Sequence, residues 1–153
     1  MCGLAVLLGS AVAVFALDHL TKWLVVRDIP YEHEVPASGP ITLHHIHNRG
    51  IAFGLFPGFQ AVLVAVAVVV SLYILVVSHR AGSGPLTQVT LGAVLGGAAA
   101  NAVDRFRQGY VVDFVDLHRW PVFNVADAAI VVGIAITAFT LSRRPDHAHE
   151  TAR

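Results

Sequence analysis

Four long apolar stretches dominate this chain of 153 residues. They cover residues 4–26, 59–77, 86–106 and 122–141. Because a helix needs about 20 apolar residues to cross a bilayer, we expect four transmembrane helices. Only 13% of the residues are charged, whereas soluble domains have roughly 25%. The sequence therefore predicts a mainly α, polytopic membrane protein that forms a single domain over residues 1–153, with a polar tail at 142–153.

Charge and cysteine content exclude several function classes. The formal net charge is +0, so the chain has no basic surface of the kind that binds nucleic acid, and we expect no nucleic-acid partner. Cys2 is the only cysteine, which leaves no intrachain disulfide and no cysteine-rich metal site. Nothing in the sequence predicts a cofactor.

Connectivity predicts that the polar residues gather on one side of the membrane. Four antiparallel helices place residues 31–57 and 108–121 on the same side, close to the ends of the helices that carry most of the buried charge. Lys and Arg are divided too evenly between the two sides to fix the orientation by charge. The polar residues near this side are Asp18, Lys22, Asn101, Asp104, Arg105, Asn124 and Asp127.

The segment between the first two apolar stretches predicts a small β-containing region outside the membrane. Residues 30–40 are rich in turn formers, and residues 41–47 contain the β-branched and His residues of a short strand. The chain then continues into Asn48-Arg49-Gly50, where glycine permits a tight backbone.

Helical spacing predicts which polar residues meet. Asp18 and Lys22 are four residues apart, with the acid first, which is the favourable order for an ion pair. Asn101, Asp104 and Arg105 share one helical stripe, and we expect Asp104 to pair with Arg105. Counted from a helix start at residue 122, Asp127 would lie roughly 7 to 8 Å inside the helix.

Two acids at the edges of apolar helices, Asp113 and Asp127, are the main candidates for a functional role. Ionised carboxylates beside hydrocarbon are costly, so they mark either functional sites or paired structural anchors. Two acids that converge on one site favour function. Neighbouring carboxylates that share one proton can activate water and protonate a leaving group, which is the chemistry of amide hydrolysis without a covalent intermediate.

Five sequence blocks, in order, resemble the lipoprotein signal peptidase family, also called signal peptidase II. Two positions differ from the usual pattern of that family, Ala100 in place of Gly and His19 in place of Gln. The blocks are Asp18-His19-Leu20-Thr21-Lys22, residues 48–53, residues 96–105, Val111-Val112-Asp113-Phe114 and Phe123-Asn124-Val125-Ala126-Asp127.

The resemblance implies an intramembrane aspartic endopeptidase of the bacterial cytoplasmic membrane, with Asp113 and Asp127 as the catalytic pair. Such an enzyme removes signal peptides from prolipoproteins by cutting before a diacylglyceryl-modified cysteine. Its partners are then these lipidated precursors and membrane lipids. The family also implies cytoplasmic termini and an active site toward the outer surface.

Roles for the remaining polar residues follow from their positions. We expect substrate contacts from Asn48, Gly50, Asn101, Arg105 and Asn124. Asp18, Lys22 and Asp104 are interpreted as structural or supporting residues. The alternative for several of them is hydrogen bonding that only holds the helices together. Phe53 and Phe114 are expected to line a pocket between the helices.

Two rival functions remain open in the sequence. His44, His45 and His47 with an acid offer the ligand types of a zinc enzyme, although alternate residues of a strand face opposite sides and no His-Glu-x-x-His motif is present; we predict no metal site. A proton-coupled transporter or channel subunit also places acids in helices. The polar residues gather at one end, however, and the second apolar stretch has no charged residue.

Overall fold

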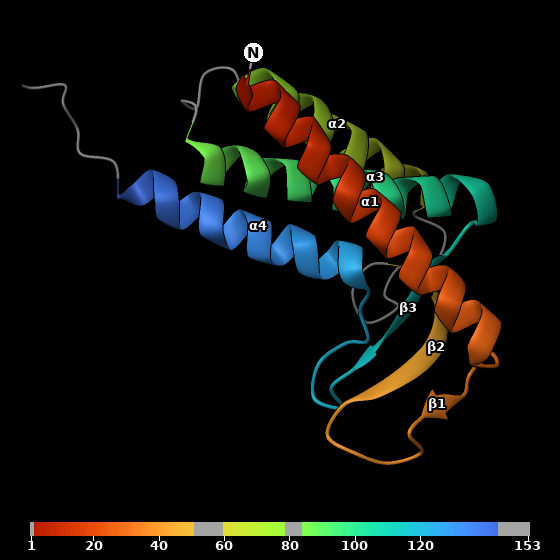
Figure 1. The fold of residues 1–153 in the computed structure, drawn as a ribbon. Coiled ribbons are helices and arrows are strands. Elements are labelled where there is room, and N and C mark those ends of the chain that lie inside the picture. The colour runs from red at the N-terminus through yellow and green to blue at the C-terminus, as the bar shows by residue number, and fades with distance from the viewer. Residues whose placement is uncertain (1, 51–59, 79–83, 144–153) are drawn as a thin grey trace, which may run out of the picture.

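The computed structural model describes residues 2–50, 60–78 and 84–143. These residues form four helices and a three-stranded sheet, and the sheet lies at the end of the helical bundle where α1 ends and α4 begins (Figure 1). The elements in chain order are α1 (Cys2–Asp28), β1 (Glu34–Val35), β2 (Thr42–Asn48), α2 (Gln60–Ser78), α3 (Pro85–Gln108), β3 (Val111–Asp116) and α4 (Val125–Ser142).

The four predicted apolar stretches correspond to the four helices. Three of them, α1, α3 and α4, are long and apolar enough to cross a membrane, and α2 contains a shorter apolar run, Ala61–Val76. Large apolar side chains such as Val12, Val69 and Val131 are well exposed on the bundle. Outward-facing apolar side chains are what a bilayer requires of a spanning helix. The predicted fold class, mainly α and polytopic, is confirmed.

Helix α3 is the centre of the bundle and packs against each of the other three helices. Its small residues permit this close approach, because a side chain added at Gly92 or Gly96 would collide with the backbone of α1, and one added at Gly97 would collide with the backbone of α4. Gly109 ends α3 with a left-handed backbone, φ 76°, and its N–H bonds to Arg105 O. The chain then turns directly into β3.

The sheet is antiparallel, with the strand order β1-β2-β3. Strand β2 confirms the strand predicted at residues 41–47. β3 was not predicted. Its apolar face is buried against the end of α1, where Val112 and Phe114 pack on Val25 and Ile29. This contact fixes the sheet on the bundle.

The connection from β3 to α4 folds back onto β3. Phe123 pairs with Val115, donating its N–H to Val115 O at 3.1 Å and accepting the N–H of Val115 at 2.8 Å. The residue that follows, Asn124, is therefore held beside β3 at the start of α4.

Candidate functional site

The sequence analysis expected Asp113 at the edge of an apolar helix. The structure places it on β3 instead. Its side chain is almost completely buried. Oδ1 accepts a hydrogen bond from Asn124 Nδ2 at 2.6 Å, and Oδ2 accepts one from Asn48 Nδ2 at 2.8 Å. Burial, and secondly the charge of Asp127, raise the pKa of Asp113 to about 7.

Asp127 belongs to the first turn of α4, because the helix begins at Val125 and not at residue 122. The expected depth of 7 to 8 Å inside the helix is therefore wrong. Asn124 is the N-cap, and the two residues form a capping box: Asn124 Oδ1 accepts from Asp127 N at 2.9 Å, and Asp127 Oδ2 accepts from Asn124 N at 3.3 Å. Asn124 and Asp127 are three residues apart in the sequence, which is the spacing of a capping box.

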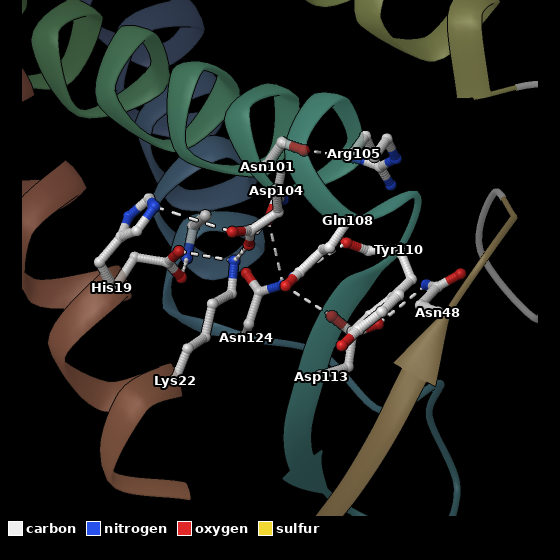
Figure 2. A network of polar contacts seen from close by, with 12 residues as sticks. His19, Lys22, Asn48, Asn101, Asp104, Arg105, Gln108, Tyr110, Asp113 and Asn124 are labelled. Atoms are coloured by element: carbon white, nitrogen blue, oxygen red, sulfur yellow. Dashed lines mark hydrogen bonds and ion pairs between the residues drawn. The ribbon is translucent and has the colours of Figure 1, made fainter. Parts of the chain in front are cut away.

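Two asparagines join the acids into one network (Figure 2). Asn101 on α3 donates Nδ2 to Asp127 Oδ1 at 2.8 Å. Asn124 Nδ2 reaches both Asp113 and, at 3.3 Å, Asn101 Oδ1. The two aspartates are therefore both bound to Asn124, one through its side-chain amide and one through the cap.

A buried ion cluster supports this network from the side of α1. Lys22 Nζ lies 2.6 Å from Asp18 Oδ2 and 2.6 Å from Asp104 Oδ2, and it donates to Asn101 Oδ1 at 2.9 Å. The predicted ion pair of Asp18 with Lys22 is present. The expected pairing of Asp104 with Arg105 is wrong, because neighbouring residues on a helix point in different directions and Asp104 faces Lys22 and His19 instead.

Asp18 also reaches α4. Its Oδ1 accepts the N–H of Ala126 at 2.8 Å, which satisfies one of the free donors of the first turn. The ion cluster thus connects α1 and α3 to the start of the helix that carries Asp127.

The remaining predicted residues lie at the same end of the bundle. Arg105 Nη1 donates to Asn101 O at 3.4 Å, and Arg105 lines a cleft with both aspartates. Gly50 N donates to Asn48 Oδ1 at 3.0 Å, so Gly50 turns the chain after Asn48. Through this hydrogen bond Gly50 is connected to Asn48, which in turn bonds to Asp113.

The described residues around the aspartates enclose a cleft of about 370 Å³. Apolar side chains form much of its wall, among them Trp120 and Phe123 of the connection between β3 and α4, and Val131 of α4. The sequence analysis assigned none of these three side chains to a pocket. A second, almost entirely apolar pocket shares these three side chains and Asp127. Phe114 does not line the cleft, because it packs toward α1. Phe53 lies outside the described residues.

The three histidines of the rival zinc interpretation do not converge. His45 is buried, with Nδ1 2.8 Å from Ile29 O, and His47 stacks on Tyr110. Among the described residues, the group of possible metal ligands that contains His44 includes neither of them.

Three helices long and apolar enough to cross a membrane, together with the shorter apolar run of α2, define a multi-pass membrane protein, and Asp113 and Asp127 mark the candidate site at one end of the bundle. The family described as Signal peptidase (SPase) II has a sequence model that matches residues 10–143. The chain belongs to this family and is a bacterial membrane peptidase. The resemblance found in the five sequence blocks is confirmed.

Relatives and solved structures agree with the assignment. The lipoprotein signal peptidase of Moorella thermoacetica is 41% identical over 133 residues, which cover 86% of this chain and 89% of the relative. That of Mycobacterium avium is 42% identical over 146 residues, which cover 91% and 79%. A solved bacterial membrane enzyme has the same fold, with a TM-score of 0.82 at 22% identity, covering 94% of this chain and 92% of that one.

Proposed function

We propose that the chain is an aspartic endopeptidase that removes signal peptides from prolipoproteins, cutting before a diacylglyceryl-modified cysteine. Asp113 and Asp127 are the catalytic acids. The observation that carries the proposal is that Asn124 bonds to both carboxylates at the wall of one cleft, where burial and the second acid raise the pKa of Asp113 to about 7.

The chemistry follows from one proton shared between two acids. Because two neighbouring carboxylates resist double ionisation, the pair holds one proton near neutral pH. Asp113 carries this proton at rest and Asp127 is the base that activates water. As Asp127 takes a proton from the attacking water, Asp113 donates its proton to the carbonyl oxygen, which gives a tetrahedral diol. As the diol collapses, Asp127 passes its proton to the leaving nitrogen and Asp113 takes one from a diol hydroxyl, so that the pair again holds one proton. No covalent intermediate is needed.

The other polar residues hold the acids and the substrate. Asn101 and Asn124 orient the two carboxylates, and Arg105 and Asn48 at the cleft wall are placed to contact the substrate backbone. Gly50 keeps Asn48 in position. Lys22, Asp18 and Asp104 are supporting residues that fix Asn101.

The apolar pocket beside Asp127 supports a lipidated substrate. Trp120, Phe123 and Val131 line a pocket of about 280 Å³ whose wall includes Asp127. Each buried methylene of an acyl chain contributes about 0.8 kcal/mol, so lipid chains hold the scissile bond at a fixed depth. The site faces the outer surface of the cytoplasmic membrane in this proposal, with the termini in the cytoplasm.

Replacing each acid separately tests the proposal. Asp113→Asn and Asp127→Asn should each reduce cleavage of a purified diacylglyceryl precursor by roughly 10²- to 10⁴-fold, while the protein still inserts and purifies at wild-type yield. Asp28→Asn is the matched control, because Asp28 is an exposed acid paired only with the neighbouring Arg27 among its described contacts. Substantial cleavage by either catalytic variant would reject the pair.

A precursor without the diacylglyceryl group tests the substrate class. Wild-type protein should cleave it far more slowly than the lipidated form, because the acyl chains no longer fix its depth. Equal rates for the two forms would remove the lipid requirement from the proposal and leave the aspartate chemistry intact.

A further inference from the structure

A second group of ionisable side chains lies on the sheet, away from the two aspartates. Glu34 of β1, His44 of β2 and Asp116 of β3 each bring one ligand atom within 4.8 Å of the other two. We propose that these three side chains bind one divalent transition-metal ion, of which Zn²⁺ is the best match. This site is independent of the proposed peptidase chemistry.

Strand register places the three side chains on one face of the sheet. Glu34 is directly opposite His44, and Thr42 is directly opposite Asp116. Opposed residues of an antiparallel pair share a face, as do residues two apart on one strand such as Thr42 and His44. The backbone therefore brings these ligands together, and no long side chain has to reach across the sheet.

The distance between His44 and Asp116 fits a small tetrahedral ion. Zn²⁺ binds nitrogen and carboxylate oxygen at roughly 2.0 to 2.2 Å, so its tetrahedral ligand atoms lie about 3.3 to 3.5 Å apart. His44 Nδ1 lies 3.5 Å from Asp116 Oδ2. Thr42, which is 1% exposed, donates Oγ1 to Glu34 Oε2 at 3.3 Å and so orients that carboxylate, as outer groups commonly orient metal ligands.

A cation would also balance the charge of this face. Glu34 and Asp116 are two carboxylates held close together. Within the described part of the chain, the ion pairs of Asp116 are both with histidines, His44 and His118, and the hydrogen bond to the Glu34 side chain comes from neutral Thr42. The Asp116 side chain is only 14% exposed.

His118 lies beside the proposed site and orients Asp116. Asp116 Oδ1 accepts the backbone N–H of His118 at 2.6 Å, and His118 adopts a left-handed backbone, φ 58°. Its Nδ1 lies 3.7 Å from the same carboxylate oxygen. The one imidazole and two carboxylates of the cluster suit Zn²⁺, whereas Ca²⁺ and Mg²⁺ prefer sites made only of oxygen.

The proposed ion would join all three strands. β1 has only two residues, and β3 carries Asp113 three positions before Asp116. An ion bound to one side chain from each strand would therefore hold the short β1 on the sheet and stabilise the strand that positions Asp113. Its expected effect is on stability, and it takes no part in proton transfer.

Zinc binding to the purified full-length protein tests this proposal. The sequence also contains His147 and His149, so the measurement uses a His147→Ala/His149→Ala background and a purification tag without histidines. Calorimetric titration with ZnCl₂ in detergent should give one bound ion per chain, and Zn²⁺ should raise the unfolding temperature, because a ligand that binds only the folded state stabilises it.

Two single variants and one matched control complete the design. His44→Ala and Glu34→Gln should each weaken Zn²⁺ binding at least tenfold and remove the thermal shift, whereas His33→Ala, an exposed histidine of the same segment, should change neither. Asp113→Asn should bind Zn²⁺ like the background protein, which separates this site from the peptidase. A background protein that binds no Zn²⁺, unchanged binding in both single variants, or equally tight binding of Mg²⁺ would overturn the proposal.

Discussion

At the scale of single residues, Asn124 connects the two acids through its side-chain amide and its backbone N–H. It is completely buried, yet its amide nitrogen, amide oxygen and backbone N–H all have partners. A buried polar network in which every group is bonded is rigid. Asn124 therefore holds Asp113 and Asp127 at a fixed relative position while it caps α4.

Two substitutions at Asn124 should separate its two roles. Asn124→Ser keeps a cap oxygen but loses the amide that bonds Asp113, so we expect a loss in kcat on the order of 10²-fold with little change in unfolding temperature. Asn124→Ala loses the cap as well, which costs about 1 kcal/mol more. Steady-state kinetics and thermal unfolding in detergent measure the two effects. Equal thermal losses in both variants would contradict the separation.

The raised pKa of Asp113 predicts the pH profile. An acid whose folded pKa is about 7 keeps its proton below pH 7 and loses it as the pH rises. Since the proposed active form has one shared proton, kcat/KM should fall about tenfold per pH unit above pH 7. Initial rates with the lipidated precursor measure this limb, and Asp28→Asn should show the same profile. A flat profile through this range would contradict the assignment of the acid.

The sequence selected polar residues that the structure brings together, but it predicted few of the contacts between them. The apolar context of Asp113 and Asp127 was enough to select both, and the spacing of Asp18 and Lys22 predicted their ion pair. The partner of Asp104 was missed because it lies on another helix, 82 residues away. Helical spacing reports only neighbours on the same helix, so contacts between elements need the folded chain.

At the scale of elements, α3 determines how closely the bundle packs. Gly92 and Gly96 face α1, and Gly97 faces α4. Without side chains at these positions, the backbones approach closely, as small residues allow in membrane helices. The functional consequence is that Asn101 and Asp104, one turn or two further along α3, reach Lys22 and Asp127.

Gly96→Ala should weaken this packing. The added Cβ would overlap the carbonyl of Ala11, and backbone cannot move aside as a flexible side chain can. We expect a loss of about 1–3 kcal/mol, measured by thermal unfolding in detergent. Gly9→Ala is the matched control, because a Cβ there meets nothing within 4 Å, and alanine should preserve or raise stability. Equal stability of the two variants would argue against close packing at Gly96.

The helices were predictable as elements, and β3 was not. Each helix exceeds the length at which apolar runs are unambiguous, and its bounds fall within a few residues of the expected ones. Val111-Val112-Asp113-Phe114 is a short apolar run, which periodicity cannot assign to a strand or to a helix. Its strand conformation depends on pairing with β2, a segment more than 60 residues earlier.

At the scale of the whole molecule, the cluster around Lys22 joins three helices. Asp18 and Lys22 come from α1, Asp104 from α3, and Asp18 also caps the first turn of α4. A buried cation that serves two carboxylates cannot be removed without leaving both of them uncompensated. The orientation of Asp127 therefore depends on a charge balance set on a different helix.

Lys22→Met should destabilise the protein by roughly 3–5 kcal/mol, because it leaves two buried carboxylates without their cation. Loss of folded protein in detergent and a lower unfolding temperature measure the effect. Asp18→Asn/Lys22→Met/Asp104→Asn should recover much of the stability, since no charge is left unpaired. Arg27→Met is the control on the same helix, where the ion pair with Asp28 is exposed and little change is expected. A Lys22→Met protein as stable as this control would refute the prediction.

Residues at the start of α4 and on the neighbouring strand β3 form hydrogen bonds with residues far earlier in the chain. Ala126 bonds to Asp18, 108 residues earlier, and Asp113 bonds to Asn48, 65 residues earlier. During synthesis on the ribosome, a nascent chain that ends before the fourth helix contains Asp113 but neither Asn124 nor Asp127. The acid pair is therefore assembled only when the last helix joins the bundle, and under the proposed function a chain without that helix has no peptidase activity.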